Sequence, residues 1–468
     1  MANVQPLQGI RYSGEKVGNL ARIVTPPYDV ISAEAQANYY AQSPYNVIRL
    51  ELGQEGPEDT SLNNRYTRAA TAFAEWRLDG VLQQEELSSY YLYQQRFTYD
   101  NQSYTRTSLL ARVWLEPWSN RIVLPHEHTL AKAKNDRLQL LRASATNLSP
   151  IMSLYDDPQG RIRRLLSTYA TQAAIQITDE VNEEHILHPI ADELVVSSIV
   201  DFFLHRQLYI ADGHHRYETA LQYRDEVREQ RHELLDTDAA NFVLMALIDL
   251  DDPGLLVLPT HRLLFNLNPQ ALQHLSSEKL ARYFTVQTLG DIESSDALLT
   301  QLAHAGNVGT DLSRPPLRPP LRPSLRPPLR PSLRPPLRPP LRPPLVLCIA
   351  GQNWLLSMNE QGRQRMQESG HSAAWNNLDV AVAHTLIIED MLGLNAQDMT
   401  AGTNIRYIRD AAQALQAVQT GEAQAAILLN ATRVRQICDV AEADDRMPQK
   451  STYFYPKLIT GLVMNPLW

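Results

Sequence analysis

The sequence predicts a mixed fold of the α+β to α/β type, with two closely packed domains over residues 1–250 and 251–468. Three observations lead to this prediction. The chain has 468 residues, enough for about three domains of ordinary size, and 44% of them are hydrophobic against 20% charged. The first half mixes helical and strand periods. In the last third, short apolar runs alternate with amphipathic helices, as in layered α/β folds.

The first half begins with two clear helices and a hairpin. Ser32 is a good N-cap residue, and the pattern after it predicts a helix over 33–42. A second helix is predicted over 65–78. Asp100-Asn101 lies between two aromatic-rich runs, which predicts a β-hairpin. The hairpin strands are expected over 90–97 and 105–114, further helices over 135–143, from 162 and over 214–227, and strands over 208–211 and 242–250.

The second half adds a further hairpin and a regular alternation. Apolar runs over 345–350 and 353–358 flank Gly351-Gln352, which predicts two antiparallel strands. The other elements expected here are helices over 297–304, 378–392, 410–418 and 432–441, and strands over 405–408, 425–429 and 458–464.

A proline-rich insert interrupts the second domain. Residues 314–345 are eight copies of Arg-Pro-(Pro or Ser)-Leu, which can form neither helix nor sheet and favour polyproline II or disorder. The flanking patterns look like one domain, so we expect an insert over 313–345 in a loop of the C-terminal domain. It is either a tolerated surface expansion or a docking arm. Without its eight arginines the net charge falls from −9 to −17, so nucleic acid is not an expected partner.

Several classes of protein are excluded by composition. Two cysteines, Cys348 and Cys438, cannot build a disulfide framework or a zinc ribbon, and we expect both to be buried apolar fillers. The N-terminus has no signal-peptide pattern, and no apolar run approaches the ~18 residues of a membrane span. We therefore expect a cytoplasmic protein without a membrane partner.

The strongest local signal is Asp212-Gly213-His214-His215-Arg216, where a predicted strand runs directly into a helix. The first turn of a helix presents unpaired N–H groups and the positive end of the dipole. Gly213 allows close approach of a ligand, and the two histidines and Arg216 add donors, which together suit phosphate. Asp212 could orient an imidazole or hold a metal ion. The alternative is a capped helix with ordinary surface histidines.

A second signal is His126-Glu127-His128 in an extended segment. Alternation places both imidazoles on one side and Glu127 on the other. Such a pair can bind a divalent ion, with Asp212, His214 or His215 completing the site, or move a proton. A solvated loop is the alternative.

Two further segments offer ligand contacts. The rigid run Thr25-Pro26-Pro27 delivers Tyr28 and Asp29 to fixed places, as substrate contacts or as a structural turn. Near the C-terminus, cations and hydroxyls gather between a helix and a strand and could bind an anion, unless the segment is only a packed aromatic loop. The candidates there are Lys450, Ser451, Thr452 and Lys457.

The chain resembles a known family in six segments: TPPYDVIS, LPHEHT with a later DRL, SPIMSLY, ADGHHRYETAL, LPTHRLL and MPQKSTYFYPKLITGL. They are similar to the signature blocks of the DUF1015 family, and the repeat lies outside that pattern. The family's members occur near serine-biosynthesis genes, which implies a role with small metabolites.

The DGHHR block alone also resembles the phosphate motif of the ParB/sulfiredoxin-like superfamily, which includes free serine kinases. This resemblance implies a ParB/sulfiredoxin-like N-terminal portion. It also implies that His214, His215 and Arg216 contact phosphate, while Asp212 supports the turn or a magnesium ion.

These observations predict an enzyme that acts on a phosphorylated metabolite or nucleotide, by phosphoryl transfer or phosphate-ester hydrolysis, in serine metabolism or near it. Mg²⁺ and a nucleotide are the expected cofactors. Fixed cations would bind the anion. The residue that moves a proton would be one of the histidines, and Asp212 or Glu127 would orient that histidine. The candidate histidines are His126, His128, His214 and His215. Two alternatives stay open: a metal-dependent hydrolase with ligands His126, His128, Asp212 and His214, and a non-catalytic phospho-ligand sensor or scaffold.

Overall fold

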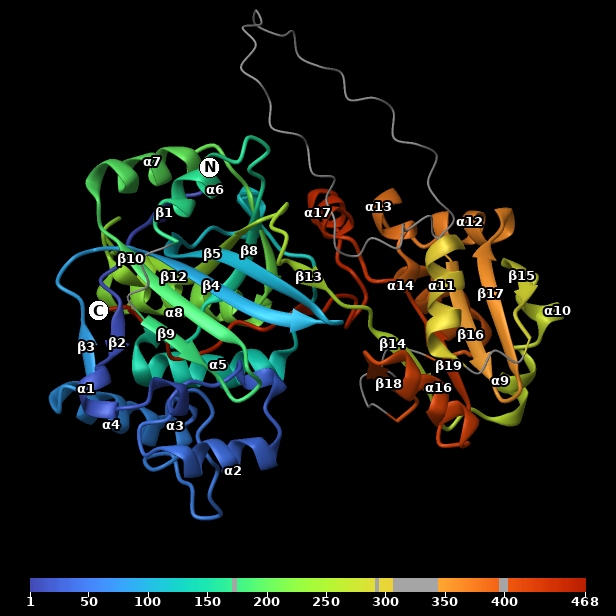
Figure 1. Cartoon of the computed structure of the whole chain (residues 1–468), viewed down its shortest axis with the longest axis horizontal. Helices are drawn as coiled ribbons and strands as arrows, with labels where there is room; N and C mark the ends of the chain where they lie inside the picture. The colour runs from blue at the N-terminus through green and yellow to red at the C-terminus, as the bar shows by residue number, and fades with distance from the viewer. Residues whose placement is uncertain (171–174, 291–293, 306–343, 395–402) are drawn as a thin grey trace, which may run out of the picture. The chain divides into compact units, whose positions relative to one another are not determined.

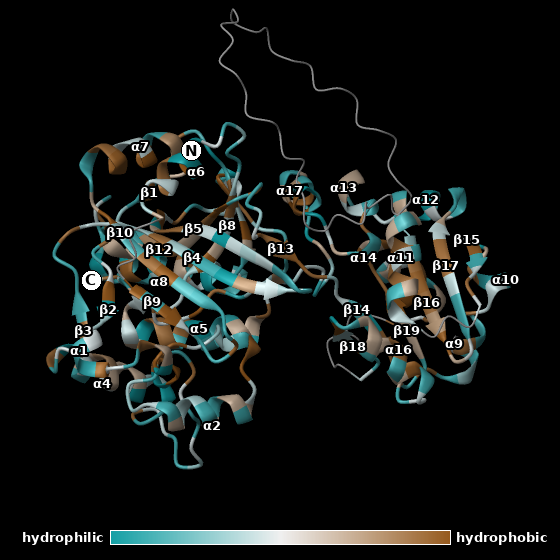
Figure 2. Cartoon of the chain, in the orientation of Figure 1, coloured by the Kyte–Doolittle hydropathy of each residue, from teal (hydrophilic) through white to brown (hydrophobic). Residues whose placement is uncertain are grey.

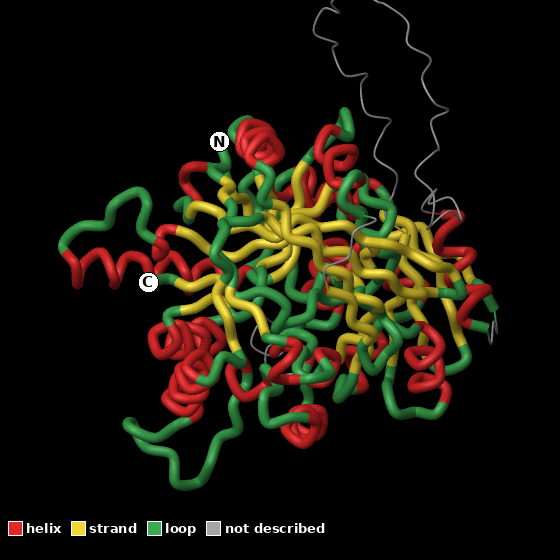
Figure 3. The backbone as a smooth tube through the Cα atoms, turned by 60° about the vertical axis from the view of Figure 1, so that its left-hand side comes forward, coloured by secondary structure: helices red, strands yellow, loops and turns green. Residues whose placement is uncertain are grey.

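A computed structural model describes residues 1–170, 175–290, 294–305, 344–394 and 403–468. It divides into two compact units. Unit 1 comprises Met1–Leu256 and Phe454–Trp468, and unit 2 comprises Val257–Tyr453. In both units the strands gather inside and helices lie outside them, so the predicted mixed α/β class is confirmed (Figures 1 and 3).

The last fifteen residues correct the expected domain division, which assigned all of 251–468 to the second domain. They belong to unit 1, where Thr25 bridges Thr460 and Ile10 bridges Met464. The strand predicted over 458–464 is wrong, because these isolated bridges never extend into a ladder. Only Asn465–Pro466 forms a strand there, paired with Thr146–Asn147.

Unit 1 is built on a nine-stranded mixed sheet in the order β6-β11-β8-β12-β5-β4-β10-β9, with β1 added to β5. The predicted hairpin is its centre: β4 and β5 pair from Tyr91–Leu110 to Tyr99–Gln102. Asp100 and Asn101 both take positive φ, as a tight hairpin turn requires. The strands of unit 1 are β1 (Val4–Gln5), β2 (Ile10–Tyr12), β3 (Leu82–Gln84), β4 (Tyr90–Tyr99), β5 (Gln102–Trp114), β6 (Val123–Leu124), β7 (Thr146–Asn147), β8 (Ile151–Tyr155), β9 (Ile175–Thr178), β10 (Glu184–Ile190), β11 (Leu208–Asp212), β12 (Phe242–Asp249), β20 (Phe454–Tyr455) and β21 (Asn465–Pro466), and β13 (Leu256–Val257) spans the boundary.

Two helices of unit 1 begin at caps that the sequence provides. The Ser32 side chain accepts a hydrogen bond from Ala35 N at the start of α2, and Asn64 forms a capping box at the start of α4. Both helices have the bounds that the sequence predicts. The helices are α1 (Gly14–Val17), α2 (Ala33–Gln42), α3 (Ile48–Glu51), α4 (Arg65–Leu78), α5 (Ala131–Ser144), α6 (Arg161–Ser167), α7 (Glu193–Phe203) and α8 (His214–Arg231), with 3-10 turns η1 (Leu20–Arg22), η2 (Tyr28–Val30), η3 (Trp118–Asn120) and η4 (Ala239–Asn241).

The core of unit 1 lies between this sheet and its helices. Every residue of β12 is buried, and Figure 2 shows both hydrophobic and hydrophilic residues along the strands and helices. Parallel pairing of β6 with β11 places the ends of these two strands side by side, and α5 packs against α8. The HEHT segment follows β6, and the DGHHR segment begins with the last residue of β11, so the fold brings the two motifs to one sheet edge.

Unit 2 has a six-stranded sheet in the order β15-β17-β16-β19-β14-β18, and every printed pairing in it is antiparallel. It therefore represents the α+β end of the predicted range. Cys348 and Cys438 are buried here, as expected. The strands are β14 (His261–Leu264), β15 (Phe284–Thr288), β16 (Pro344–Ile349), β17 (Gln352–Met358), β18 (Ile405–Ile408) and β19 (Ala425–Leu428); the helices are α9 (Pro269–Gln273), α10 (Ser277–Leu280), α11 (Ser295–Ala305), α12 (Glu360–Gln367), α13 (Ala373–Asn376), α14 (Asp379–Val382), the π-helical η5 (Ala383–Met391), α16 (Ala411–Gln419) and α17 (Val434–Glu442).

The insert predicted over 313–345 falls between α11 and β16, both in unit 2. Apart from Pro344 and Leu345, which begin β16, it lies outside the described residues. Within the described ranges, no helix has both the length and the apolar character that a membrane crossing needs.

Candidate functional site

The turn between β11 and α8 has a conformation that only glycine accepts easily. Gly213 has φ 98° and ψ 28°. The Arg216 side chain folds back over it, so a Cβ at position 213 would lie 2.9 Å from Arg216 Nη2. The glycine therefore permits both the sharp turn and the inward position of the guanidinium.

Asp212 joins two cations that come from distant parts of the sequence. Its Oδ2 accepts a hydrogen bond of 2.8 Å from Arg216 Nη2, and its Oδ1 pairs with Lys457 Nζ. Burial by itself would raise the pKa of Asp212, but the charges of Lys457 and Arg216 outweigh it and hold the pKa well below its usual value. The three side chains carry one net positive charge at the start of an 18-residue helix.

His126 and His214 fasten the loop after β6 to this helix start. His126 is fully buried, and its Nδ1 donates to Ile210 O at 2.8 Å. The His126 backbone N–H donates to His214 Nε2 at 3.2 Å, so the Nδ1 of His214 carries the proton and faces Glu127 Oε2 at 3.7 Å. The rings of the two histidines meet edge to face, with centroids 4.7 Å apart.

The rest of the same loop is held by the next turn of α8. The Leu130 backbone N–H donates to His215 Nε2 at 2.9 Å. Glu218 accepts hydrogen bonds from the Thr129 hydroxyl at 2.6 Å and from Lys134 Nζ at 2.9 Å. His126, His214 and His215 each bond a backbone group, so they hold the two motifs in register.

The histidine pair 126/128 does not act as the alternation predicts. His126 is buried against His214, whereas His128 is exposed, and Glu127 turns toward both buried imidazoles. The segment is too irregular for strict alternation, because its pairing as a strand ends at Leu124. The interpretation of two imidazoles on one side is therefore wrong.

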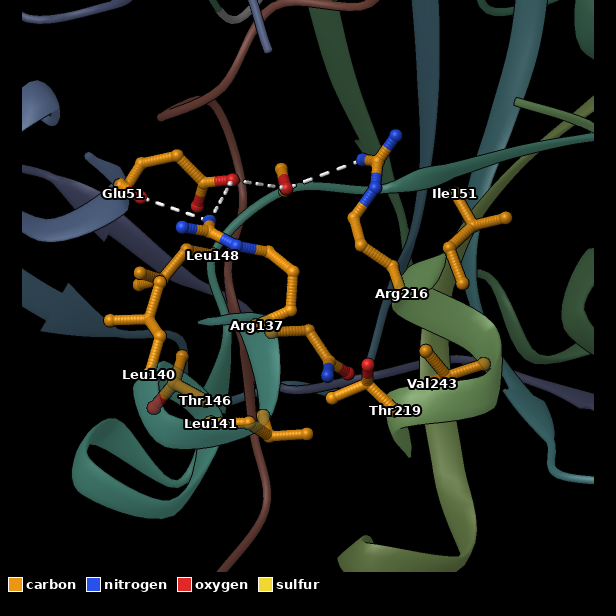
Figure 4. A pocket seen from close by; sticks show the side chains of 12 residues that line it. Glu51, Arg137, Leu140, Leu141, Thr146, Leu148, Ile151, Arg216, Thr219 and Val243 are labelled. Carbon is orange, nitrogen blue, oxygen red and sulfur yellow. Dashed lines mark hydrogen bonds and ion pairs between the residues drawn. The ribbon is translucent and has the colours of Figure 1, made fainter. Parts of the chain in front are cut away.

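A small cavity lies beside Arg216, with a volume of about 50 Å³ (Figure 4). Glu51, only 3% exposed, lines it together with Arg137 and Ser149. Glu51 Oε1 accepts from Ser149 Oγ at 3.0 Å and from Arg137 Nη1 at 3.3 Å, and Ser149 Oγ lies 3.3 Å from Arg216 Nη1. The other residues of the wall are Leu140, Leu141, Thr146, Asn147, Leu148, Ile151, Thr219 and Val243.

Tyr28 contacts Arg137, one of the residues that line this cavity, whereas Asp29 is exposed. The Arg137 guanidinium lies over the Tyr28 ring, 4.0 Å from its centroid. Burial raises the pKa of Tyr28 to about 12, even though Arg137 and Arg216 act to lower it. The phenol is therefore neutral at physiological pH and can only donate or accept a hydrogen bond.

The lysine-rich C-terminal segment is divided between the two units. Lys457 belongs to unit 1 and contacts Asp212. Lys450, Ser451 and Thr452 belong to unit 2: Lys450 is exposed, and Ser451 is buried with its backbone oxygen bonded to the Thr432 hydroxyl. Ligand binding by these three residues stays a prediction.

The predicted metal ligands Asp212, His126 and His128 do not form a three-ligand cluster. Both oxygens of Asp212 already bond cations, and His128 is exposed. In the part of the chain that the structure describes, one group of three such side chains has its ligand atoms close enough to share an ion. It consists of Asp179, Glu183 and His185.

Sequence reasoning missed Glu51, Ser149 and the role of Arg137. Glu51 and Ser149 are 98 residues apart in sequence, and neither belongs to a catalytic motif that spacing reveals. A buried glutamate beside an arginine becomes visible only in the folded chain. Glu218 was also missed, although its position one turn after His214 on α8 was a usable signal.

Comparison with known proteins gives a family match and distant structural likenesses. Residues 4–381 match the family described as "Protein of unknown function (DUF1015)". No match is found among curated proteins. Three solved structures, each similar over 76% of this chain, are a free serine kinase in complex with AMP (TM-score 0.33, 9% identity, 92% of that chain), a conserved hypothetical protein from Pyrococcus furiosus (0.32, 10%, 95%) and SbnI with C-terminal truncation from Staphylococcus aureus (0.32, 10%, 87%). Similarity this low assigns neither a ligand nor an activity to this chain.

Proposed function

This chain belongs to the DUF1015 family, and we propose that it is an enzyme acting on a small phosphorylated metabolite or nucleotide, by phosphoryl transfer or phosphate-ester hydrolysis. One observation carries the proposal. Asp212 holds Arg216 and Lys457 at the start of α8, beside a cavity that contains the buried carboxylate of Glu51. Cations that bind an anion thus adjoin a group that can accept a proton.

The cations are prepared for phosphate by their fixed positions. Arg216 and Lys457 are 13% and 12% exposed, and Asp212 neutralises only one of their two charges. A phosphate oxygen can receive charge-assisted hydrogen bonds from both without further ordering of their side chains. Among the described residues, Arg216 Nε is buried without a hydrogen-bond partner, and so is a donor available to such an oxygen. Phosphoryl chemistry relies mainly on positioning and charge stabilisation of this kind.

Glu51 is the residue that we propose as general base. Within the described structure its hydrogen bonds and ion pair reach only Oε1 of the carboxylate, so Oε2 can accept a proton from a ligand hydroxyl. The cavity of about 50 Å³ is far below the 300–1,000 Å³ of a drug-sized site. It admits a few heavy atoms, and so suits the hydroxyl end of a small metabolite while the phosphate stays at Arg216.

The histidines receive a positioning role in this proposal. His126 and His215 each use a ring nitrogen in a hydrogen bond to a backbone group of the segment that contains the other motif. The Nδ1–H of His214 faces Glu127, which is 31% exposed and is the second candidate for moving a proton. If the ligand is a nucleotide, Mg²⁺ would arrive on its phosphates, because Asp212 is already held by two cations.

The test is a panel of nucleotides and phosphorylated small metabolites, with and without Mg²⁺, read by thermal shift and by ³¹P NMR for turnover. We expect stabilisation by a subset of the panel and loss of that stabilisation in Arg216→Met. Lys132→Met is the matched control, because Lys132 is an exposed cation at the start of α5. A panel that neither stabilises the wild-type chain nor is turned over would remove the proposal.

A further inference from the structure

A cluster of metal-binding side chain types lies in the β9–β10 hairpin of unit 1. Asp179, Glu183 and His185 have ligand atoms that all lie within 4.8 Å of one another. His185 is fully buried and Glu183 is 7% exposed, so this is not a solvated surface group. The hairpin itself holds the first two residues together, because the Asp179 N–H donates to Glu183 O at 3.0 Å.

The two carboxylates have no Lys or Arg ion pair in the described structure. The side-chain partner of Asp179 is His185, whose Nε2 lies within hydrogen-bond distance, 3.2 Å, of Oδ2. Glu183 has a hydrogen bond with the Tyr455 side chain, and Arg106 acts on it only through longer-range electrostatics. Asp179 Oδ1 accepts hydrogen bonds from the backbone N–H groups of Val181 and Glu183 at 3.0 and 2.8 Å, so the buried Glu183 is the carboxylate that a bound cation would chiefly stabilise.

A contact at Nδ1 of His185 fixes the orientation of the imidazole and leaves Nε2 facing the two carboxylates. Its Nδ1 lies 2.8 Å from the Tyr93 hydroxyl, and the Tyr93 ring stacks on the imidazole with centroids 6.0 Å apart. This contact directs Nε2 toward the carboxylates and fixes the ring. Metal-bound histidines in proteins almost always have such an outer partner on the second nitrogen.

We propose that Asp179, Glu183 and His185 bind a divalent transition-metal ion, Zn²⁺ or Mn²⁺, through two carboxylate oxygens and His185 Nε2. Ligands about 2.1 Å from a tetrahedral ion are roughly 3.4 Å apart. The 3.2 Å between Nε2 and Asp179 Oδ2 therefore needs little adjustment to admit an ion. One imidazole and two carboxylates suit Zn²⁺ and Mn²⁺ better than Ca²⁺, which prefers oxygen ligands alone.

The ion would brace the segment that supplies Lys457. Tyr455, which bonds Glu183, lies two residues before Lys457. His185 also pairs in register with Gln95, whose Nε2 donates to the Lys457 backbone oxygen at 3.0 Å. The site thus has a structural role near the anion-binding residues, and metal binding does not depend on the proposed function.

The experiment uses the full chain, stripped with a chelator, desalted and titrated with Zn²⁺ or Mn²⁺ alone. Calorimetry gives affinity and stoichiometry, elemental analysis gives the retained ion, and thermal unfolding gives stability. We expect about one ion per chain and a rise in Tm that chelator reverses. Wild-type protein that binds no ion at millimolar metal, or shows no Tm change, overturns the proposal without any variant.

Three substitutions locate the ion. Glu183→Gln keeps the side-chain volume and should weaken binding by about 100-fold or more, since loss of even an outer partner costs about 10–100-fold. Tyr93→Phe removes only the outer partner and should weaken binding by about 10-fold. Glu184→Gln is the control, because Glu184 is the adjacent carboxylate and already pairs with Arg96. Equal affinity in wild-type and Glu183→Gln protein places the ion elsewhere and overturns the assignment.

Discussion

Replacing Lys457 by methionine removes one of the two cations proposed to bind phosphate. Methionine keeps most of the apolar stem of lysine, so the packing of this 12% exposed side chain is largely conserved. A hydrogen bond to a charged group contributes about 1.5–3 kcal/mol. Because 1.4 kcal/mol corresponds to tenfold in affinity, phosphate binding should weaken by about 10- to 100-fold.

The same substitution should lower the free energy of unfolding only moderately. Removing one partner of a buried ion pair costs about 3–5 kcal/mol when the remaining charge is left alone. Asp212 keeps its 2.8 Å bond to Arg216 and is 17% exposed, so the cost here should be smaller, about 1–2 kcal/mol. Urea denaturation measures this, and a folded variant with weakened binding separates recognition from stability.

The assay is isothermal titration of inorganic phosphate and of ADP into wild-type, Lys457→Met and Lys132→Met protein at one ionic strength. Lys132 lies on the exposed start of α5, so its substitution changes the net charge equally. The control should bind like the wild type. Equal affinity in Lys457→Met protein, or an equal loss in the control, would refute the reasoning.

Three further predictions concern the same site. Asp212→Asn should destabilise the chain by about 3 kcal/mol at pH 7, because it removes the carboxylate charge that pairs with both Arg216 and Lys457. Burial raises the pKa of Asp212, but Lys457 and Arg216 lower it by more. The stabilisation that Asp212 contributes is therefore present above about pH 4 and is lost as the pH falls through the folded pKa. Urea denaturation from about pH 7 to about pH 2 should therefore show a free energy of unfolding that depends less on pH in the variant than in the wild type. His126→Ala should lower the free energy of unfolding by about 2–4 kcal/mol, whereas His128→Ala should change it by less than about 0.5 kcal/mol, because only His126 is buried; a larger loss at His128 would contradict this placement. Glu51→Gln should retain phosphate-ligand binding in calorimetry but reduce turnover in the ³¹P assay by about 100-fold or more, as loss of a general base requires, and unchanged turnover would exclude that role.

The sequence predicts those parts of the fold that local signals determine. Ser32 caps its helix, and the aromatic pattern after residue 64 gives α4 its bounds, since capping and amphipathicity act within a few residues. The prediction of a strand over 458–464 is wrong because an apolar run alone does not determine which neighbouring strand, if any, it will pair with. In the folded chain this segment crosses unit 1 with isolated bridges only.

Only part of the candidate site could be predicted from the sequence, because the other part depends on contacts between residues that are far apart in the chain. The Asp212-to-Arg216 motif indicates its own turn, because strand, glycine and helix are consecutive. Glu51 meets Arg137 and Ser149 across separations of 86 and 98 residues, and only their burial together distinguishes these three from other polar residues. The sequence could not distinguish the roles of Lys450 and Lys457, because it does not show that the chain leaves unit 2 after Tyr453 and enters unit 1 at Phe454.

A crystal structure of the full chain soaked with ADP or inorganic phosphate tests the central claim most directly. We expect a phosphate group within about 3 Å of both the Arg216 guanidinium and Lys457 Nζ, at the start of α8. A phosphate group bound to other residues, with the Asp212–Arg216–Lys457 cluster unchanged and its helix start unoccupied, would contradict it.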